Sequence, residues 1–423
     1  MSGVVSCAVT LVVDPVQIAR IAEAIAEAPL ATFDLEFLSQ DRLVPTLCLV
    51  QVSWLPAHVR VDAAAAEIVA VEPLIALIDP LAADVQPVFE ALRVHPCVVA
   101  HAPRQDLGLV AARFGLAMPA VADTQLMAAF AGLGDQVGLS ALAGELLGVT
   151  LGKEQQWTDW ARRPLSDAQL AYAAADVRYL PALFALLRER LGARLPWALA
   201  ESAVVAAEAV AAAAVTPDTA WAQLGGLRGL DARALAAAVA LAGWRQRVAI
   251  ELDRPLGQVL HEKVLIDLAR TRPDSPGAIR AARGISPLAK QRADDLLAAL
   301  EAARPGAIPL IAPGRPGSTR AQRWAEILLA IVQLVADQTG VAARLLATRA
   351  DAEELARTVD ERGLAAAAGL PAFTTWRQAV LGPAWRGFLD GSLLVAGDPA
   401  SPAGIALCAR SALAGTPSVA PST

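Results

Sequence analysis

Apolar and polar residues alternate with two different periods along this chain, and the period changes near Pro217. Residues 31–37 (Ala-Thr-Phe-Asp-Leu-Glu-Phe) alternate strictly with a period of two, which is typical of a strand with one buried face. Shorter apolar runs predict further strands at 47–52, 74–78, 97–100 and up to Ala122-Asp123. Helical spacing separates the later strands, so the first half is predicted to be an α/β layered domain.

Beyond Pro217 the apolar spacing is helical throughout, in segments of roughly 10–15 residues, which predicts an all-α second half. Thr216-Pro217 ends an alanine-rich helix expected at 197–215, and prolines alternate with glycines at 305–319, as in a linker. The predicted domains are 1–200, 216–304 and 320–412, with the linker at 305–319 and a flexible tail at 413–423.

The 423 residues are 55% hydrophobic, with a mean hydropathy of +0.45, largely because alanine is abundant. No uninterrupted apolar stretch reaches the roughly 18–20 residues that a membrane-spanning helix needs, and no basic segment precedes an apolar one at the N-terminus. The cysteines lie far apart without a C-x-x-C pair, at positions Cys7, Cys48, Cys97 and Cys408. These features predict a cytoplasmic protein without a disulfide framework.

The net charge of −6, taken alone, argues against a nucleic-acid partner, because phosphate binding usually needs clustered Lys and Arg. The charge is, however, unevenly distributed. Residues 1–215 contain 13 Lys/Arg and 23 Asp/Glu, whereas residues 221–304 contain 13 Lys/Arg and 9 Asp/Glu. An acidic first half is thus joined to a basic middle segment, and the overall charge excludes very little.

In the first predicted strand, Thr32, Asp34 and Glu36 point to the face opposite the apolar residues. Two carboxylates on one face of a strand in apolar surroundings repel each other and lose hydration. A divalent cation is the simplest compensation. The alternative interpretation is an edge strand with a solvated polar face.

Further carboxylates occupy positions suited to chemistry. Asp106 falls in the first turn of a helix after the fourth predicted strand, where α/β domains place functional loops, although a favourable helix-dipole interaction is the plainer explanation. Tyr172 and Asp176 are four residues apart and share one helical face, and Ser166 with Gln169 offers a capping box for that helix. The alternative is an ordinary amphipathic helix with a tyrosine on its rim.

The D-x-E strand, the Asp about 70 residues later and the Y-x-x-x-D helix about 70 further on together resemble the three motifs of DEDD-superfamily exonucleases, tyrosine subclass. The flanking segments resemble ribonuclease D at 101–107 (His-Ala-Pro-Arg-Gln-Asp-Leu), 123–125 (Asp-Thr-Gln), 158–165 (Thr-Asp-Trp-Ala-Arg-Arg-Pro-Leu) and 172–180 (Tyr-Ala-Ala-Ala-Asp-Val-Arg-Tyr-Leu). The resemblance covers nearly all of residues 8–195.

This resemblance implies a ribonuclease H-like fold, in which three antiparallel strands are followed by parallel ones and flanked by helices. It also implies that Tyr172 orients the attacking water, and that two Mg²⁺ or Mn²⁺ ions are held by Asp34, Glu36, Asp106 and Asp176. Two ions about 3.5–4 Å apart activate the nucleophile and stabilise the leaving oxygen of an in-line attack. The expected reaction releases 5′-mononucleotides from RNA 3′ ends, in the maturation of tRNA precursors and other structured RNAs.

Some features depart from the family pattern. Leu35 replaces the usual Thr between the first two carboxylates, the segment 38–45 lacks the usual aromatic pair before its proline, and 54–71 is longer than the normal connection. These departures bring substrate contacts into question more than metal binding, since the carboxylates and the tyrosine are all present.

Residues beside the motifs have plainer alternatives. His101 is expected to form a structural hydrogen bond at a strand end rather than to act as a base, because the tyrosine position is filled. Contacts with RNA phosphates are possible for Lys153, Arg162 and Arg163, with solvated surface as the equal alternative for each.

The basic middle segment resembles the HRDC domain, a small helical module shared by helicases and ribonuclease D, at 221–227, 239–247, 254–255 and 279–286. Its expected phosphate-binding patch, which would position RNA without reading bases, consists of Arg280, Arg283, Lys290 and Arg292. A solvated helical face is the alternative. Residues 320–412 resemble the second, more divergent C-terminal domain of ribonuclease D.

The sequence therefore predicts an α/β ribonuclease H-like exonuclease domain, with a mixed sheet flanked by helices, followed by two all-α helical-bundle domains. Its predicted function is that of a monomeric, metal-dependent 3′–5′ exoribonuclease with an RNA partner and no membrane. One alternative is a 3′–5′ DNA exonuclease of the same superfamily. Another is a non-catalytic RNA-binding factor, which would be expected to have lost at least one metal ligand, and none is lost here.

Overall fold

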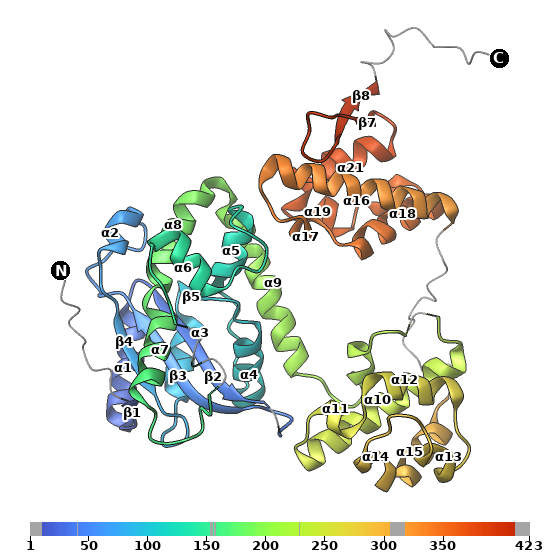
Figure 1. The fold of residues 1–423 in the computed structure, drawn as a ribbon, viewed down its shortest axis with the longest axis horizontal. Helices are drawn as coiled ribbons and strands as arrows, with labels where there is room; N and C mark the ends of the chain where they lie inside the picture. Colours follow the sequence, from blue (N-terminus) through green and yellow to red (C-terminus); the bar gives the residue numbers. More distant parts are fainter. Residues whose placement is uncertain are drawn as a thin grey trace. The chain divides into compact units, whose positions relative to one another are not determined.

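The computed structural model describes residues 11–39, 41–152, 155, 158–227, 229–304 and 318–410 (Figure 1). The chain forms two compact units. The larger comprises Met1–Thr124, Gly138–Gly192 and Ala198–Gly314, and the smaller comprises Gln125–Val137, Ala193–Trp197 and Arg315–Thr423. The predicted tail at 413–423, and all but the end of the predicted linker at 305–319, lie outside the described residues, as does Cys7.

A six-stranded mixed sheet forms the centre of the first half of the chain. Its strands are β1 Leu11–Val12, β2 Ala31–Leu38, β3 Thr46–Trp54, β4 Leu74–Ile78, β5 Val98–Ala100 and β6 Val121–Asp123. In the order β1-β4-β3-β2-β5-β6, the strands β2, β3 and β4 are antiparallel, and β5 continues the sheet parallel to β2 and β6. All the predicted strands are confirmed, and the short β1, parallel to β4, was not predicted.

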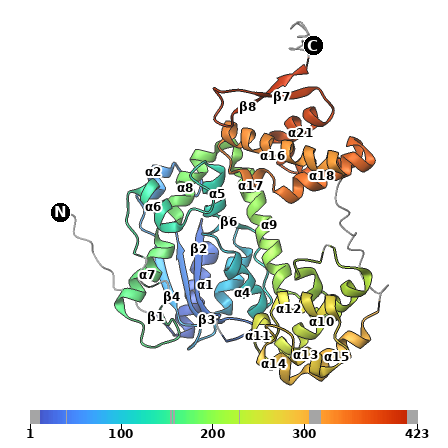
Figure 2. The same ribbon diagram turned by 45° about the vertical axis from the view of Figure 1, so that its right-hand side comes forward.

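The two faces of β2 meet different surroundings. Phe33 and Leu35 point into the main core and are 0% and 5% exposed. Helices α1 (Pro15–Glu27) and α3 (Gln86–Val94) cover this core face with their apolar residues. On the other face, α7 (Asp167–Arg178) lies across β3 and β4, so helices flank the sheet on both sides (Figures 1 and 2). The period-two pattern therefore predicted correctly which residues of β2 face the core.

The remaining helices of the first half of the chain are α2 Ala65–Val69, α4 Arg104–Phe114, α5 Thr124–Phe130, α6 Leu139–Leu147, α8 Leu180–Leu191 and α9 Leu195–Ala213. The last of these is the predicted alanine-rich helix, which begins two residues earlier than expected. Because α9 continues unbroken past residue 200, the predicted domain boundary at that residue falls inside a helix.

A helical bundle occupies the basic middle segment. Its helices are α10 Ala232–Leu252, α11 Leu256–Val259, α12 Glu262–Thr271, α13 Pro276–Arg280, α14 Pro287–Gln291 and α15 Ala293–Ala302. Asp231, Ser275 and Ser286 accept hydrogen bonds from the first turns of α10, α13 and α14, which fixes where these helices begin. Trp244 and Leu265 are buried in the bundle's own core.

The smaller unit is helical except at its end. Its elements after residue 318 are α16 Thr319–Thr339, α17 Ala343–Leu346, α18 Arg349–Arg362, α19 Pro371–Thr374, α20 Arg377–Val380, α21 Gly382–Leu389, β7 Leu393–Gly397 and β8 Ile405–Ala409. The antiparallel hairpin of β7 and β8 was not predicted from the sequence. Its two apolar runs of five residues contain no polar alternation, so their spacing did not distinguish a strand from a helix.

Aromatic side chains join three chain segments inside the smaller unit. Trp376 stacks on Trp197 with ring centroids 5.7 Å apart, and it meets Phe130 edge-on at 4.8 Å. The backbone N–H of Ala342 also donates to the carbonyl of Ala129 at 3.1 Å. Segments near residues 130 and 195 thus belong to the core of this unit, which the sequence patterns did not predict.

The helical run Asp167–Ala213 passes a length-and-composition test for a membrane span. It consists of the separate helices α7, α8 and α9, and half of its most apolar window is buried in the protein. Buried core helices pass the same test, so this run is weak support for a membrane segment.

Candidate active site

The face of β2 opposite the core carries Asp34 and Glu36, as the alternation predicted. Both side chains are half-buried. One carboxylate oxygen from each, together with one from Asp176 of α7, forms a group whose members all lie within 4.8 Å of one another. Residues 140 positions apart in the sequence are thus brought to one point by the packing of α7 on the sheet.

Asp106 comes from the segment after β5, the strand that pairs with β2 on the edge opposite β3. Strand β5 runs parallel to β2 and ends at Ala100, and α4 begins four residues later with Asp106 in its first turn. The Asp106 side chain is buried, its charge raises the pKa of Glu36, and the charge of Asp34 raises the pKa of Asp106. It lies near the group of three carboxylates without belonging to the set within 4.8 Å.

Helix α7 begins with the predicted capping box. The Ser166 hydroxyl accepts from the backbone N–H of Gln169, whose side chain accepts from the backbone N–H of Ser166. This cap fixes the start of the helix and therefore the rotation of its faces. Tyr172 and Asp176, one turn apart, are joined by a side-chain hydrogen bond in which the phenol donates.

Ionising all of these carboxylates together is energetically unfavourable. Burial raises the pKa of Glu36 to about 9, with the charges of Asp34, Asp176 and Asp106 adding to the effect. Burial likewise raises the pKa of Asp34 to about 7 and that of Asp176 to about 8, and it raises the pKa of Asp106. The Tyr172 pKa is raised by burial and by the neighbouring carboxylates, so the phenol stays protonated at neutral pH.

This site fits divalent metal ions. Its donors are all carboxylate oxygens, which hard cations such as Mg²⁺ and Mn²⁺ prefer. The raised pKa values show that the ionised carboxylates need a compensating positive charge, and no Lys or Arg forms a salt bridge with any of the four in the described part of the chain. Positive ions between the carboxylates would provide that charge.

Comparison with known proteins gives a family for this arrangement. Residues 9–192 match a family described as "3'-5' exonuclease", and residues 234–300 match the HRDC domain. A ribonuclease D from Gluconacetobacter diazotrophicus is 32% identical over 385 residues, covering 89% of this chain and 92% of the relative. The chain belongs to the ribonuclease D family.

Other members of the ribonuclease D family agree. A ribonuclease D from Jannaschia sp. is 33% identical over 382 residues, covering 88% of this chain and 92% of the relative. A crystal structure of Escherichia coli RNase D superimposes on this chain with a TM-score of 0.72 and 28% sequence identity, and the match covers 90% of this chain and 99% of that one. That protein is described as an exoribonuclease involved in structured RNA processing. The predicted family, fold class and enzyme class, a 3′–5′ exoribonuclease of the ribonuclease D type, are confirmed.

His101 has the structural role that the sequence favoured over catalysis. Its Nδ1 lies 2.9 Å from the Thr124 hydroxyl, which in turn donates to the carbonyl of Ala100 at 3.1 Å. The backbone N–H of Ala102 donates to Asp123 at 2.9 Å. These contacts tie the end of β5 to the end of β6 and hold the turn that leads to Asp106.

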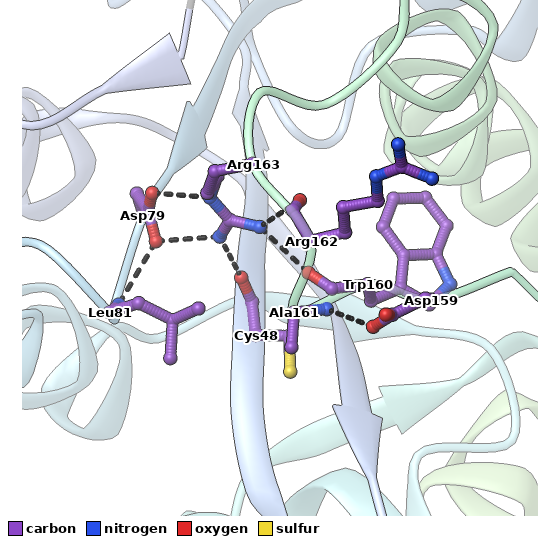
Figure 3. A network of polar contacts seen from close by, with 8 residues as sticks. All are labelled: Cys48, Asp79, Leu81, Asp159, Trp160, Ala161, Arg162 and Arg163. Carbon is purple, nitrogen blue, oxygen red and sulfur yellow. Dashed lines mark hydrogen bonds and ion pairs between the residues drawn. The ribbon is translucent and has the colours of Figure 1, made fainter.

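Arg163, a candidate for RNA phosphate contact, is instead part of a structural network (Figure 3). Its guanidinium forms two hydrogen bonds of 2.6 Å with Asp79 and donates to the carbonyls of Cys48 and Trp160 at 2.7 Å. Arg162 is exposed, and Lys153 lies outside the described residues. The donors of Arg163 are thus used within the fold, and its contact with RNA phosphates stays an untested prediction.

Two departures from the ribonuclease D pattern lie away from the carboxylates. Leu35 points into the core on the opposite face of β2. The long connection 54–71 begins beside Ala31, three residues along β2 from Asp34, which is roughly 10 Å at the usual strand rise. The side chain of Arg188 donates to carbonyls of this connection, and Glu189 accepts from the backbone N–H of Ala65 at 2.5 Å. Leu35 is therefore not part of the carboxylate face of the sheet.

The third departure, the segment between β2 and β3, is fastened to the helical bundle. Arg42 Nε donates to Asp253 at 2.6 Å, and the backbone N–H of Leu43 donates to the same carboxylate at 3.1 Å. The Leu43 side chain packs against the bundle core. The segment that follows Glu36 is thus held by the bundle rather than by an aromatic pair of its own.

The four basic residues of the expected phosphate-binding patch are not equivalent. Arg280 pairs with Asp294 at 3.0 Å, and Arg292 pairs with a glutamate of α10 at 2.6 Å. Arg283 and Lys290 are exposed, and neither has a salt-bridge partner within 4.0 Å among the described residues. The charge that is free to meet phosphates is therefore concentrated on two residues.

Gln51 is a buried polar residue near the carboxylates that no sequence motif singled out. It is the single amide in the apolar run Leu47–Val52, it is 0% exposed, and it stands opposite Asp34 in the β2–β3 ladder. A polar residue in the middle of a central buried strand was the available signal, because such residues need partners that the strand itself does not supply.

We expect the metal-free protein to become less stable as the pH rises from about 5 to 9. The unfolded carboxyls titrate near pH 4, whereas the folded pKa values of Asp34, Asp176 and Glu36 are about 7, 8 and 9. Between those limits the folded protein binds more protons than the unfolded chain, so the free energy of unfolding falls with rising pH. Melting temperatures in chelator at pH 5.5 and 8.5 test this.

Adding Mg²⁺ should raise the melting temperature more at pH 8.5 than at pH 5.5, because the ions bind the ionised carboxylates. A melting temperature in chelator that is flat or rising over this range would contradict the assigned burial of the carboxylates. Surface carboxylates such as Asp62, which is hydrogen-bonded to Arg60, and Asp231, which accepts from the backbone N–H of Ala234, have lowered pKa values and affect stability only below this window.

Proposed function

We propose that this chain trims the 3′ ends of tRNA precursors and other structured RNAs, releasing 5′-mononucleotides with the help of two Mg²⁺ or Mn²⁺ ions. The convergence of Asp34, Glu36 and Asp176 within 4.8 Å is the observation that carries the proposal. Membership of the ribonuclease D family over almost the whole chain supports RNA as the substrate. We further propose that the protein acts as a cytoplasmic monomer.

In this proposal the metal ligands are Asp34, Glu36, Asp106 and Asp176. Bound divalent ions supply Lewis-acid activation of the attacking water and stabilise the charge on the leaving oxygen. The carboxylates fix where the ions sit because β2, α4 and α7 are rigid elements, each anchored in the core.

Tyr172 is proposed to orient the water. Its hydroxyl is held by the hydrogen bond to Asp176, and Trp160, with its ring centroid 6.1 Å away, packs against the phenol ring. The water attacks the phosphorus of the last nucleotide, and the bond from phosphorus to the 3′ oxygen of the preceding nucleotide breaks. That oxygen takes up a proton, so the products are a 5′-mononucleotide and an RNA one residue shorter with a free 3′-hydroxyl.

The decisive assay uses a 5′-labelled tRNA with a short 3′ extension, incubated with Mg²⁺ or Mn²⁺. We expect a ladder of products shortened one nucleotide at a time, and no products in chelator or with Asp34→Ala. Cleavage that survives the chelator, or full activity of the variant, would contradict the metal mechanism. A DNA strand of the same sequence tests the first alternative, since faster degradation of the DNA than of the RNA favours a DNA exonuclease. RNA that is bound but not cleaved favours the second alternative, a non-catalytic RNA-binding factor.

The bundle of α10–α15 is proposed to hold the RNA through Arg283 and Lys290. Replacing both with glutamine should weaken RNA binding and lower the slope of log K against log salt by about one to two units, because each neutralised phosphate contributes about 0.7–0.9. Binding titrations from low to high salt measure this slope.

The matched control is the double replacement of Arg20 and Arg93 with glutamine. Both are exposed, and they lie on α1 and α3, on the core side of the sheet. If the control lowers the slope of log K against log salt by the same amount, the change in RNA binding comes from the total charge and not from this patch. Arg280→Gln should lower the RNA affinity and the salt slope less than Arg283→Gln does, because Arg280 already pairs with Asp294.

A further inference from the structure

Gln51 lies on the carboxylate face of the sheet, beneath α7. In the antiparallel pairing of β2 and β3, Asp34 stands directly opposite Gln51, and Thr32 stands opposite Ser53. Directly opposed residues point to the same face, with Cβ atoms about 4.5–5.5 Å apart. The side chain of Gln51 therefore emerges next to that of Asp34.

The neighbouring polar residues on this face are satisfied. The Ser53 hydroxyl lies 2.7 Å from that of Thr32, and it donates to the backbone carbonyl of Val177 at 2.9 Å. This contact is one of several between α7 and β3. Both hydroxyls thus serve the packing of the helix on the sheet.

Gln51 differs from these residues. It is 0% exposed, and neither its Nε2 nor its Oε1 has a hydrogen-bond partner among the residues that the structure describes. On β4 the residue opposite is Leu77, and the next residue on this face of β3 is Leu49, both of them apolar. An unpaired buried amide destabilises a fold, and replacement by an apolar residue of similar shape would remove that cost. Packing alone therefore gives no reason for a glutamine here.

The residue paired with Gln51 across the β2–β3 ladder is itself a carboxylate. Asp34 is the cross-strand neighbour of Gln51, and an oxygen of Asp34 lies within 4.8 Å of an oxygen of Asp176. A carboxylate that binds a metal through one oxygen keeps a second oxygen free to accept a hydrogen bond. Partners of this kind orient metal ligands, and their loss typically weakens metal affinity about 10–100-fold.

We propose that Gln51 is a positioning residue of the metal site, whose side-chain amide donates to the Asp34 carboxylate and holds it in the orientation that binds the divalent ion. The inference rests on the proposed function, since it requires Asp34 to be a metal ligand. It adds a residue that touches neither the ion nor the RNA.

The test is Gln51→Met, which keeps the approximate shape of the side chain and removes the amide. We expect an unchanged or higher melting temperature in chelator, because two unpaired buried polar atoms are gone. We expect Mn²⁺ binding, measured by titration calorimetry and by the rise of melting temperature with Mn²⁺ concentration, to weaken at least tenfold. The Mn²⁺ concentration for half-maximal activity should rise by the same factor.

Ser53→Ala is the matched control. It lies two residues along the same face and loses the contacts to Thr32 and Val177. It should melt at a lower temperature in chelator and bind Mn²⁺ as tightly as the wild type. Gln51→Leu repeats the experiment with a second side chain, should the methionine variant be poorly folded.

The possible outcomes are distinct. Gln51→Met that binds Mn²⁺ as tightly as the wild type contradicts the inference alone. Gln51→Met that behaves like Ser53→Ala, less stable with intact Mn²⁺ affinity, also overturns it and makes Gln51 a packing residue. A wild-type protein that binds no Mn²⁺ contradicts the proposed function itself, and the inference with it.

Discussion

Asp176→Asn is expected to abolish most of the RNA-degrading activity while making the metal-free protein more stable. Asparagine keeps the shape of the side chain and removes a charge that the site resists, since burial and Asp34 raise the Asp176 pKa to about 8. At pH 8.5 the gain in unfolding free energy should be on the order of 2 kcal/mol. The rate should fall about 10³-fold, since metal-ion catalysis contributes several kcal/mol to the transition state.

The matched control for this change is Asp167→Asn, in the first turn of the same helix. Asp167 is exposed and lies one residue after the Ser166 cap. It should leave the rate unchanged and lower stability slightly, because a negative charge near a helix N-terminus is favourable. Melting curves in chelator and single-turnover rates with Mg²⁺ measure both quantities. An Asp176→Asn protein that is less stable in chelator, or that retains most of its rate, would contradict the assigned role.

The elements that carry the site could be predicted because each has a local signal. The period-two alternation of 31–37 assigned Asp34 and Glu36 to one face of β2. The four-residue spacing of Tyr172 and Asp176 and the Ser166 capping box gave both the helix and its functional face. Each of these signals lies within about one or two turns of chain, where backbone geometry alone fixes which side chains share a face.

The features that could not be predicted depend on residues distant in the sequence. The structural role of Arg163 could not be predicted, because its partner Asp79 is 84 positions away in the sequence. Its charge alone suggested a phosphate contact. The partial neutralisation of the basic patch depends on Asp294, which belongs to another helix than Arg280. The isolation of Gln51 became visible only once the register placed it opposite Asp34 and under α7. No spacing rule contains this information, because it arises from tertiary packing.

The network around Arg163 connects the site to the stability of the sheet (Figure 3). Asp79, at the end of β4, is 3% exposed, and its oxygens accept from Arg163 Nε and Nη2 at 2.6 Å each. The same guanidinium binds the carbonyl of Cys48 in β3 and that of Trp160 in the segment before α7. A single side chain thus ties two strands to the segment that positions the helix carrying Tyr172.

Arg163→Met is therefore expected to cost about 3–5 kcal/mol, because it leaves the buried Asp79 without a compensating charge. Adding Asp79→Leu should recover much of this loss, since removing both charges leaves no unpaired ion. The control is Arg60→Met, which breaks an Arg–Asp pair whose side chains are 78% and 66% exposed. It should cost far less stability than Arg163→Met, because water screens an exposed ion pair. Hydrogen exchange of the backbone amides in β3 and β4 measures how far these strands are destabilised. Equal protection of these amides in the Arg163 and Arg60 variants would show that the network is not needed to hold the strands.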